Sequence, residues 1–145
     1  MRKTMAAMAA VAAFGLAGMV PAAAQPMQLE ITGADGAPVM GDPAKGAQVF
    51  NQCKQCHTIQ AGQNRIGPTL YQIIGRQTGT VEGFRYSKAN QESGITWTQQ
   101  ELFVYLENPR AKIPGTTMAF AGLKNAEQRA NLIAYLIQES NKPAQ

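Results

Sequence analysis

The sequence has few of the residues that bind metals or cross-link protein chains. Its 145 residues include two cysteines and one histidine. A structural zinc site needs four Cys or His ligands. The chain has only three such residues in total, which excludes a site of this kind. A single histidine also excludes any centre that is held by two imidazoles. Two cysteines allow at most one disulfide, so the chemistry of the chain has to use a very small set of side chains.

A strong charge of one sign is also absent. The formal net charge is +4, from 13 basic and nine acidic residues. Arg2 and Lys3 lie in an N-terminal segment that we expect to be removed, which leaves 11 basic residues against nine acidic ones. Proteins that bind nucleic acid carry a strong basic patch or stripe. The composition therefore gives no support to nucleic-acid binding.

Long apolar runs are absent after residue 20. The uncharged run 5–20 follows Arg2 and Lys3 and ends at Pro21, and the small residues 22–24 then provide a cleavage site. This pattern is typical of a secretory signal peptide. The run has 16 residues, fewer than the roughly 20 that a membrane-spanning helix needs, so an uncleaved anchor is the weaker alternative. We expect cleavage before Gln25 and a soluble, exported chain of 121 residues that forms one domain.

The segment Cys53–His57 has the sequence Cys-Lys-Gln-Cys-His, and C-x-x-C-H is typical of covalent haem attachment. Two thiols one helical turn apart can add to the two vinyl groups of one porphyrin, and the adjacent histidine can reach the iron. A thioredoxin-type redox pair would need a βαβ pattern, which the sequence does not show. A Cys53–Cys56 disulfide is conceivable in an exported protein but would leave His57 unexplained. The motif predicts one covalent haem c.

The mature chain shows helical signals and no convincing strand. Asp42 followed by Pro43 predicts a helix that runs to about Cys56. Three further helices are expected: a short one over 87–93, one that begins with a capping box at Thr98 and ends at Pro109, and a final one after Asn125. Residues 25–41 are predicted to form an extended N-terminal arm that precedes the domain 42–145. The predicted class is all-α, with three main helices, a short helix and long loops around the haem.

The sixth position on the iron needs a second ligand. Met27, Met40 and Met118 are the methionines left after signal removal. Met27 and Met40 lie in the arm, close in sequence to the His57 side, whereas Met118 lies in a late loop that can reach the opposite face. Met/His ligation raises the reduction potential and occupies both axial sites. We therefore expect one-electron transfer and no enzymatic activity.

The chain resembles the class I cytochromes c of the mitochondrial-like bacterial kind, over about 46–137. The resemblance rests on motifs spread along the chain: Cys53–His57, Gly67–Leu70, Gly75–Arg76, Phe84–Ser87, Ile95–Trp97, Tyr105–Pro109 and the Met118 loop. It implies the cytochrome c fold, in which the first and last helices cross where Gly46 and Phe50 meet Leu132 and Tyr135.

The resemblance also implies roles around the haem. The Pro68 carbonyl would accept a hydrogen bond from the second ring nitrogen of His57. Tyr86 and Trp97 would donate to a buried propionate, and Arg76 would offset its charge.

On the Met118 side, Tyr105 would lie beside the sulfur, and Thr116 and Asn90 would belong to the same network. Phe120 would shield the haem edge. Tuning of the potential and simple packing are both open explanations for this group.

The leading functional hypothesis is a monomeric periplasmic electron carrier. Its partners would be a membrane cytochrome bc-type complex, a terminal oxidase, a photosynthetic reaction centre or a periplasmic dehydrogenase of respiratory or photosynthetic metabolism. Basic residues near the proposed haem segments suit an acidic partner or an ordinary solvated surface: Lys54, Arg65, Arg85, Lys88, Arg110, Lys112 and Lys124. Two alternatives remain, a subunit held permanently on an oxidoreductase through the arm, and a ligand-binding or peroxidase-type haem protein with a labile sixth ligand.

Overall fold

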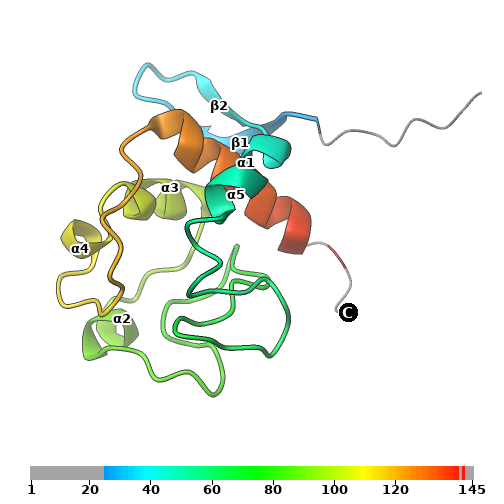
Figure 1. The fold of residues 1–145 in the computed structure, drawn as a ribbon. Coiled ribbons are helices and arrows are strands. Elements are labelled where there is room, and N and C mark those ends of the chain that lie inside the picture. Colours follow the sequence, from blue (N-terminus) through cyan, green and yellow to red (C-terminus); the bar gives the residue numbers. More distant parts are fainter. Residues whose placement is uncertain (1–24, 141, 143–145) are drawn as a thin grey trace, which may run out of the picture.

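The computed structural model of the chain describes residues 25–140 and residue 142. The expected signal peptide, residues 1–24, lies outside the described residues. Figure 1 shows a helical molecule with a two-stranded hairpin at one end and long irregular loops at the other. In chain order the elements are β1 (Met27–Thr32), β2 (Pro38–Gly41), α1 (Pro43–Phe50), α2 (Lys88–Glu92), α3 (Gln99–Glu107), α4 (Pro109–Lys112) and α5 (Ala126–Ser140). The expected helical fold is therefore present, with the hairpin and α4 as additions to it.

The first helix begins as the sequence predicted and ends earlier. The Asp42 carboxylate accepts hydrogen bonds from the backbone N–H groups of Ala44 and Lys45, at 2.9 and 3.2 Å. These bonds satisfy two of the donors that every helix leaves free at its start. The regular helix ends at Phe50 rather than near Cys56. Beyond it the chain turns more tightly, since the N–H groups of residues 51–53 bond three residues back, for example Cys53 N to Phe50 O at 2.8 Å.

Helices α1 and α5 cross at very short range. A Cβ atom on Gly46 would lie 1.9 Å from the Asn131 carbonyl oxygen and 2.7 Å from Tyr135 Cβ. One turn further along α1, the ring centroids of Phe50 and Tyr135 are 5.1 Å apart. Only glycine lets the backbones approach this closely, which explains a residue that is unfavourable inside a helix. The predicted crossing is confirmed, with Asn131 and Tyr135 as the residues that face Gly46.

The other helices begin and end at the predicted signals. Ser87 caps α2 by accepting from the Asn90 N–H, and Thr98 caps α3 by accepting from the Glu101 N–H at 3.1 Å. Asn125 accepts from the Gln128 N–H at 3.1 Å, just before α5. The four-residue helix α4 was not predicted. It follows α3 directly because Asn108 ends the one helix and caps the other.

The expectation of an extended N-terminal arm without strands was wrong. Residues 27–41 form an antiparallel hairpin that pairs Met27 with Gly41 and Thr32 with Pro38. Leu29 and Ile31 are only 3% and 4% exposed and belong to the main core. The Glu30 and Thr32 N–H groups donate to the side-chain oxygens of two glutamines at the start of α3.

The signal for this hairpin was present in the sequence. Apolar and polar residues alternate strictly over 27–32, which is typical of a half-buried strand. An Asp-Gly pair at 35–36 is typical of a hairpin turn, and Gly36 there has a φ of +79°. The richness of the segment in Ala, Gly and Pro concealed the alternation.

Long irregular segments, 51–87 and 113–125, complete the fold. Backbone hydrogen bonds tie the first of them together, including Leu70 N to Thr58 O and Gly75 N to Trp97 O, at 2.8 and 2.9 Å. Within the described part of the chain, no helix combines the length and apolar character needed to cross a membrane. Helices α1, α3 and α5 thus pack with the hairpin as a scaffold, α2 and α4 lie among the loops, and the loops carry most of the predicted site residues.

Candidate functional site

The two cysteines lie in the tight turns that follow α1. The N–H groups of Cys56 and His57 both donate to the Cys53 carbonyl, at 3.0 and 2.9 Å. The Cys53 carbonyl therefore holds the backbones of Cys56 and His57 at fixed positions relative to Cys53. Both thiols are free and partly exposed. Burial, together with the neighbouring Cys56, raises the pKa of Cys53 to about 11, so this thiol stays protonated near neutral pH.

His57 is held in one tautomer by the backbone. Its Nδ1 lies 2.8 Å from the Pro68 carbonyl oxygen, which can only accept, so Nδ1 carries the proton. The Nε2 lone pair is then free for a metal. Burial lowers the pKa of His57, the bond to Pro68 partly opposes this, and the charge of Arg76 lowers the pKa further. The net result is a neutral imidazole, the form that binds iron.

Gly67 makes room for this ring. A Cβ on Gly67 would lie 2.4 to 2.9 Å from three atoms of the His57 imidazole. Any larger residue would displace the ring from the Pro68 carbonyl. The glycine belongs to the Gly67–Leu70 motif, but its contact with His57 could be recognised only in three dimensions.

On the late loop, the Met118 sulfur is oriented by an aromatic hydroxyl. The Tyr105 hydroxyl donates to Met118 Sδ at 3.0 Å. Burial raises the pKa of Tyr105, and a side-chain hydrogen bond with Thr116 partly opposes the rise. Thr116 also accepts from the Met118 N–H at 3.3 Å. Tyr105, Thr116 and Met118 thus form one connected group, as expected.

Asn90 and Phe120 are placed differently from this group. Asn90 Oδ1 accepts from the Ser87 hydroxyl at 2.7 Å, and the Asn90 carbonyl accepts from Ser93 at 3.0 Å. Its recorded hydrogen bonds therefore belong to α2 rather than to the Tyr105 group. Phe120 is partly buried and packs against the core.

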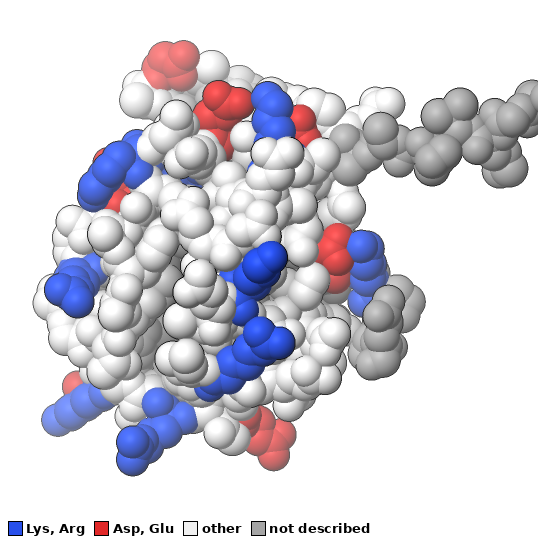
Figure 2. Space-filling model, in the orientation of Figure 1, with Lys and Arg blue, Asp and Glu red and all other residues white. Residues whose placement is uncertain are grey.

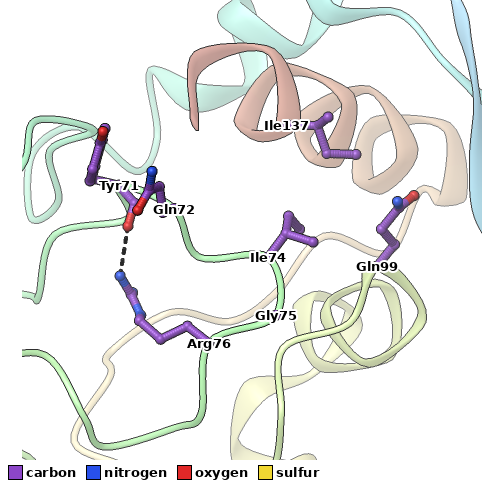
Figure 3. A pocket seen from close by; sticks show the side chains of 7 residues that line it. All are labelled: Tyr71, Gln72, Ile74, Gly75, Arg76, Gln99 and Ile137. Carbon is purple, nitrogen blue, oxygen red and sulfur yellow. Dashed lines mark hydrogen bonds between the residues drawn. The ribbon is translucent and has the colours of Figure 1, made fainter. Parts of the chain in front are cut away.

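Arg76 is held by the backbone beside a surface pocket. Its Nη atoms donate to the carbonyls of Tyr71 and Thr69, both at 2.8 Å, and Figure 3 shows the side chain reaching back toward Tyr71. The pocket has a volume of about 610 Å³ and is lined by Tyr71, Gln72, Ile74, Gly75, Arg76, Gln99 and Ile137.

The aromatic residues predicted to face the propionate side are close to this arginine or to the Met118 group. Burial raises the pKa of Tyr86, while the positive charge of Arg76 partly opposes the rise. Trp97 is 7% exposed, and its ring centroid lies 4.7 Å from that of Tyr105. Trp97 therefore joins the Arg76 segment, whose carbonyl accepts from the Trp97 backbone N–H at 2.9 Å, to the Tyr105–Met118 contact.

Sequence reasoning missed Asn64. Its side-chain oxygen accepts from the Thr69 N–H at 3.1 Å, and its amide donates to the Glu82 carbonyl at 2.9 Å. Asn64 thereby joins the loop that carries Pro68 to the loop before Phe84. An isolated asparagine in a glycine-spaced loop gives no signal of such a bridge.

These residues fit one covalently attached haem. Two free thiols lie beside a histidine whose Nε2 lone pair is available, and the bond from Nδ1 to Pro68 is the second-shell contact typical of a metal-binding imidazole. A thioether, oriented by Tyr105, supplies a soft second donor. Among the described residues, no group of three or more His, Cys, Asp or Glu side chains could hold a separate metal ion.

Comparison with known proteins gives a consistent result. The family model described as "Cytochrome c" matches residues 43–139. The chain is 53% identical over 104 residues to "Cytochrome c 2.1" of Caenorhabditis briggsae, covering 71% of this chain and 93% of that one. It is 52% identical over 98 residues to "Cytochrome c2" of Blastochloris viridis, covering 67% and 77%. Among solved structures, cytochrome cH from Methylobacterium extorquens matches with a TM-score of 0.65 and 38% identity, over 68% of this chain and 99% of that one.

Proposed function

The chain belongs to the cytochrome c family, and we propose that it carries single electrons in the periplasm through a haem whose iron is bound by His57 and Met118. Members of this family are electron-transfer proteins rather than enzymes, and they hold haem c covalently through a pair of cysteines, here Cys53 and Cys56. The observation that carries the proposed ligation is the pair of hydrogen bonds that orient the two ligands, from His57 Nδ1 to Pro68 and from Tyr105 to Met118.

Each residue of the site has a distinct task in this proposal. When bound, the haem iron accepts and releases one electron by cycling between its ferric and ferrous states. His57 and Met118 would hold the iron and would leave no position for small ligands such as oxygen and peroxide. Pro68 and Tyr105 would keep these two side chains oriented through the hydrogen bonds that they make with them. Arg76, Tyr86 and Trp97 provide positive charge and hydrogen-bond donors for a propionate, since an unpaired buried carboxylate is costly.

The proposed location and partners follow from the N-terminal sequence and the relatives. Residues 1–24 have the pattern of a signal peptide, and a bacterial cytochrome c2 is among the relatives. The donors and acceptors we propose are membrane cytochrome bc-type complexes, terminal oxidases, photosynthetic reaction centres or periplasmic dehydrogenases. Cell fractionation tests the location, and we expect the haem-loaded chain in the periplasmic fraction with Gln25 as its first residue. Haem-loaded chain confined to the cytoplasm with residues 1–24 intact would refute it.

Replacement of Met118 tests the proposed ligation. In the Met118→Ala variant the sulfur is lost, so we expect the reduction potential to decrease. Axial ligands set haem potentials over a range of roughly 0.8 V, which bounds the size of the decrease. We also expect the ferrous protein to bind carbon monoxide, which the parent should exclude. Potentiometric titration and visible spectroscopy measure the two effects.

Met40→Ala is a suitable control, because Met40 is 53% exposed on the hairpin. It should retain the potential and the carbon monoxide resistance of the parent. An unchanged potential and spectrum in Met118→Ala would show that Met118 is not the ligand. Rapid carbon monoxide binding by the parent would instead favour a ligand-binding haem protein.

A further inference from the structure

Five of the basic residues are locally neutralised by carboxylates. The ion pairs are Lys45–Glu127, Lys88–Glu92, Lys112–Glu101, Arg129–Glu107 and Lys142–Glu139. Exposed pairs of this kind contribute little to stability. They nevertheless cancel charge over short distances, and so the remaining charges decide the field that a partner meets.

The remaining acidic residues gather at the hairpin. Within the described part of the chain, four carboxylates have no basic partner within 4 Å, namely Glu30, Asp35, Asp42 and Glu82. Three of the four lie in residues 25–44, a segment that contains no lysine or arginine. Glu30 and Asp35 are exposed. The hairpin end is therefore a negative pole, defined here by Glu30, Asp35 and Asp42.

Apart from Lys124, whose ammonium donates to the Glu107 backbone carbonyl at 2.8 Å, the remaining exposed basic residues lie on the loop side of the molecule. Lys54, Arg65, Arg85 and Arg110 are exposed and have no carboxylate within 4 Å among the described residues. Lys54 lies between the two cysteines, and Arg65 Nη1 donates to its carbonyl at 3.0 Å. These four residues define a positive loop face, of which Lys54 and Arg65 adjoin the haem attachment site.

The two poles are separated in space. The hairpin packs on α3 and α5, and Figure 1 shows it at the end of the molecule away from α2, α4 and the loops. In Figure 2, in the same orientation, acidic side chains appear beside basic ones at the hairpin end at the top, and basic side chains predominate in the middle and lower part, where acidic ones are also present. The family match begins at residue 43, so the negative pole lies almost entirely in a segment outside that match.

We propose that the hairpin is an orienting element: its negative pole keeps an acidic partner surface away from the hairpin end and leaves the positive loop face, beside the haem attachment site, to dock. This inference rests on the proposed electron-carrier function and adds that the partner presents an acidic surface. The net charge of the mature chain is small, 11 basic against nine acidic residues, so the direction of the field matters more than its total. At physiological salt the Debye length is about 8 Å, so each pole acts mainly on a surface that touches it.

Net charge alone predicts that a more positive variant docks better on an acidic surface. The proposal predicts that removing the negative charge of the hairpin makes productive docking less frequent. In the double variant Glu30→Gln/Asp35→Asn the hairpin loses its repulsion while the protein becomes more positive. On a carboxylate-terminated monolayer on gold, we expect the holoprotein variant to adsorb in greater amount. The fraction of adsorbed molecules that exchange electrons in voltammetry should fall roughly twofold or more, because contact between exposed charges is worth about a few-fold in affinity. The substitutions keep shape and hydrogen-bonding capacity, including the Asp35 oxygen that accepts from Ala37.

A matched control changes the same charge on the loop side. Glu82→Gln/Glu92→Gln should raise adsorption by a similar amount and leave the electroactive fraction equal or higher. An electroactive fraction that is unchanged or increased in the hairpin variant would overturn the proposal. A redox titration of the same samples in solution separates this result from failure of the proposed function, since a protein that takes up no electron there would refute the carrier itself.

Discussion

Two hydrogen bonds orient His57 and Met118, the side chains that we propose as ligands of the haem iron. The carbonyl of Pro68 fixes the imidazole tautomer, and the hydroxyl of Tyr105 fixes the thioether. Neither contact requires a charged group, so both can be buried without the cost of desolvating an ion. At this scale the two proposed ligands are neutral groups that are each held by one specific partner.

Removal of the Tyr105 hydroxyl should shift the potential. A donor to the sulfur withdraws electron density from the ligand and so favours the reduced iron. In Tyr105→Phe we expect the potential to fall by tens of millivolts, the change that corresponds to a hydrogen bond of about 1 kcal/mol. Cyclic voltammetry of the holoprotein in solution measures it.

Tyr135→Phe provides the comparison, because Tyr135 packs on Phe50 at the helix crossing. Its potential should match that of the parent. Equal shifts in both variants would mean that Tyr105 acts through packing instead of through the Met118 sulfur.

At the scale of elements, the hairpin and the helices share one core. Leu29 and Ile31 lie in the same buried cluster as Leu102 on α3 and Ile133 on α5. The N–H of Asp42 also donates to the Asn131 side chain at 2.8 Å, which ties the end of β2 to α5. We therefore expect the hairpin to unfold together with the helices, although the family match does not include it.

Truncation of Ile31 should destabilise the whole domain. Ile31→Ala removes buried methyl and methylene groups, and such changes typically cost about 2–5 kcal/mol of the free energy of unfolding. Chemical denaturation of the holoprotein, followed at the haem absorption, should show one transition at a lower denaturant concentration. Gln28→Ala, on the exposed side of the same strand, should leave the free energy of unfolding within about 0.5 kcal/mol of that of the parent. If Ile31→Ala also left the midpoint unchanged, the hairpin would be energetically independent.

At the scale of the whole molecule, α1, α3, α5 and the hairpin occupy one side, and α2, α4 and the long loops occupy the other. The loop segment 51–87 contains no helix and begins with the turns that carry Cys53, Cys56 and His57. Loops of this length are uncommon in compact domains unless they serve a function. Wrapping of the haem explains their length, and the apolar porphyrin adds to the core of a small domain.

Loss of both attachment thiols should therefore lower the thermal stability of the fold as well as remove the haem absorption. In Cys53→Ser/Cys56→Ser we expect no haem to remain on the chain after denaturation, as measured by mass spectrometry. We also expect a lower and broader thermal transition by circular dichroism, because the loops lose the group they enclose. Ser93→Ala, a change at the partly exposed residue that follows α2, controls for handling of variants. Haem that survived denaturation in the double variant would contradict attachment through these cysteines.

Much of the fold could be predicted because its signals are local. The caps at Asp42, Ser87 and Thr98 each depend on a residue and its close neighbours in sequence. The contact of Gly46 with Asn131 and Tyr135 joins distant segments, and only the family resemblance implied that crossing. The hairpin was missed although its alternation is equally local, because composition was given more weight than periodicity. The early end of α1 could not be predicted, since the tight turns after Phe50 follow the same sequence pattern as a helix.

The sequence by itself determined the chemistry: two thiols and one imidazole in a C-x-x-C-H motif, with few alternatives among so scarce a set of ligands. Only the tertiary structure decided the orientation of these groups and the distribution of charge. His57 meets Pro68, Tyr105 meets Met118, and Asn64 joins two loops through contacts between residues well separated in sequence. The hairpin becomes a negative pole opposite the basic loops because it folds back onto α3 and α5. Such effects depend on distances in space, which the order of residues along the chain does not specify.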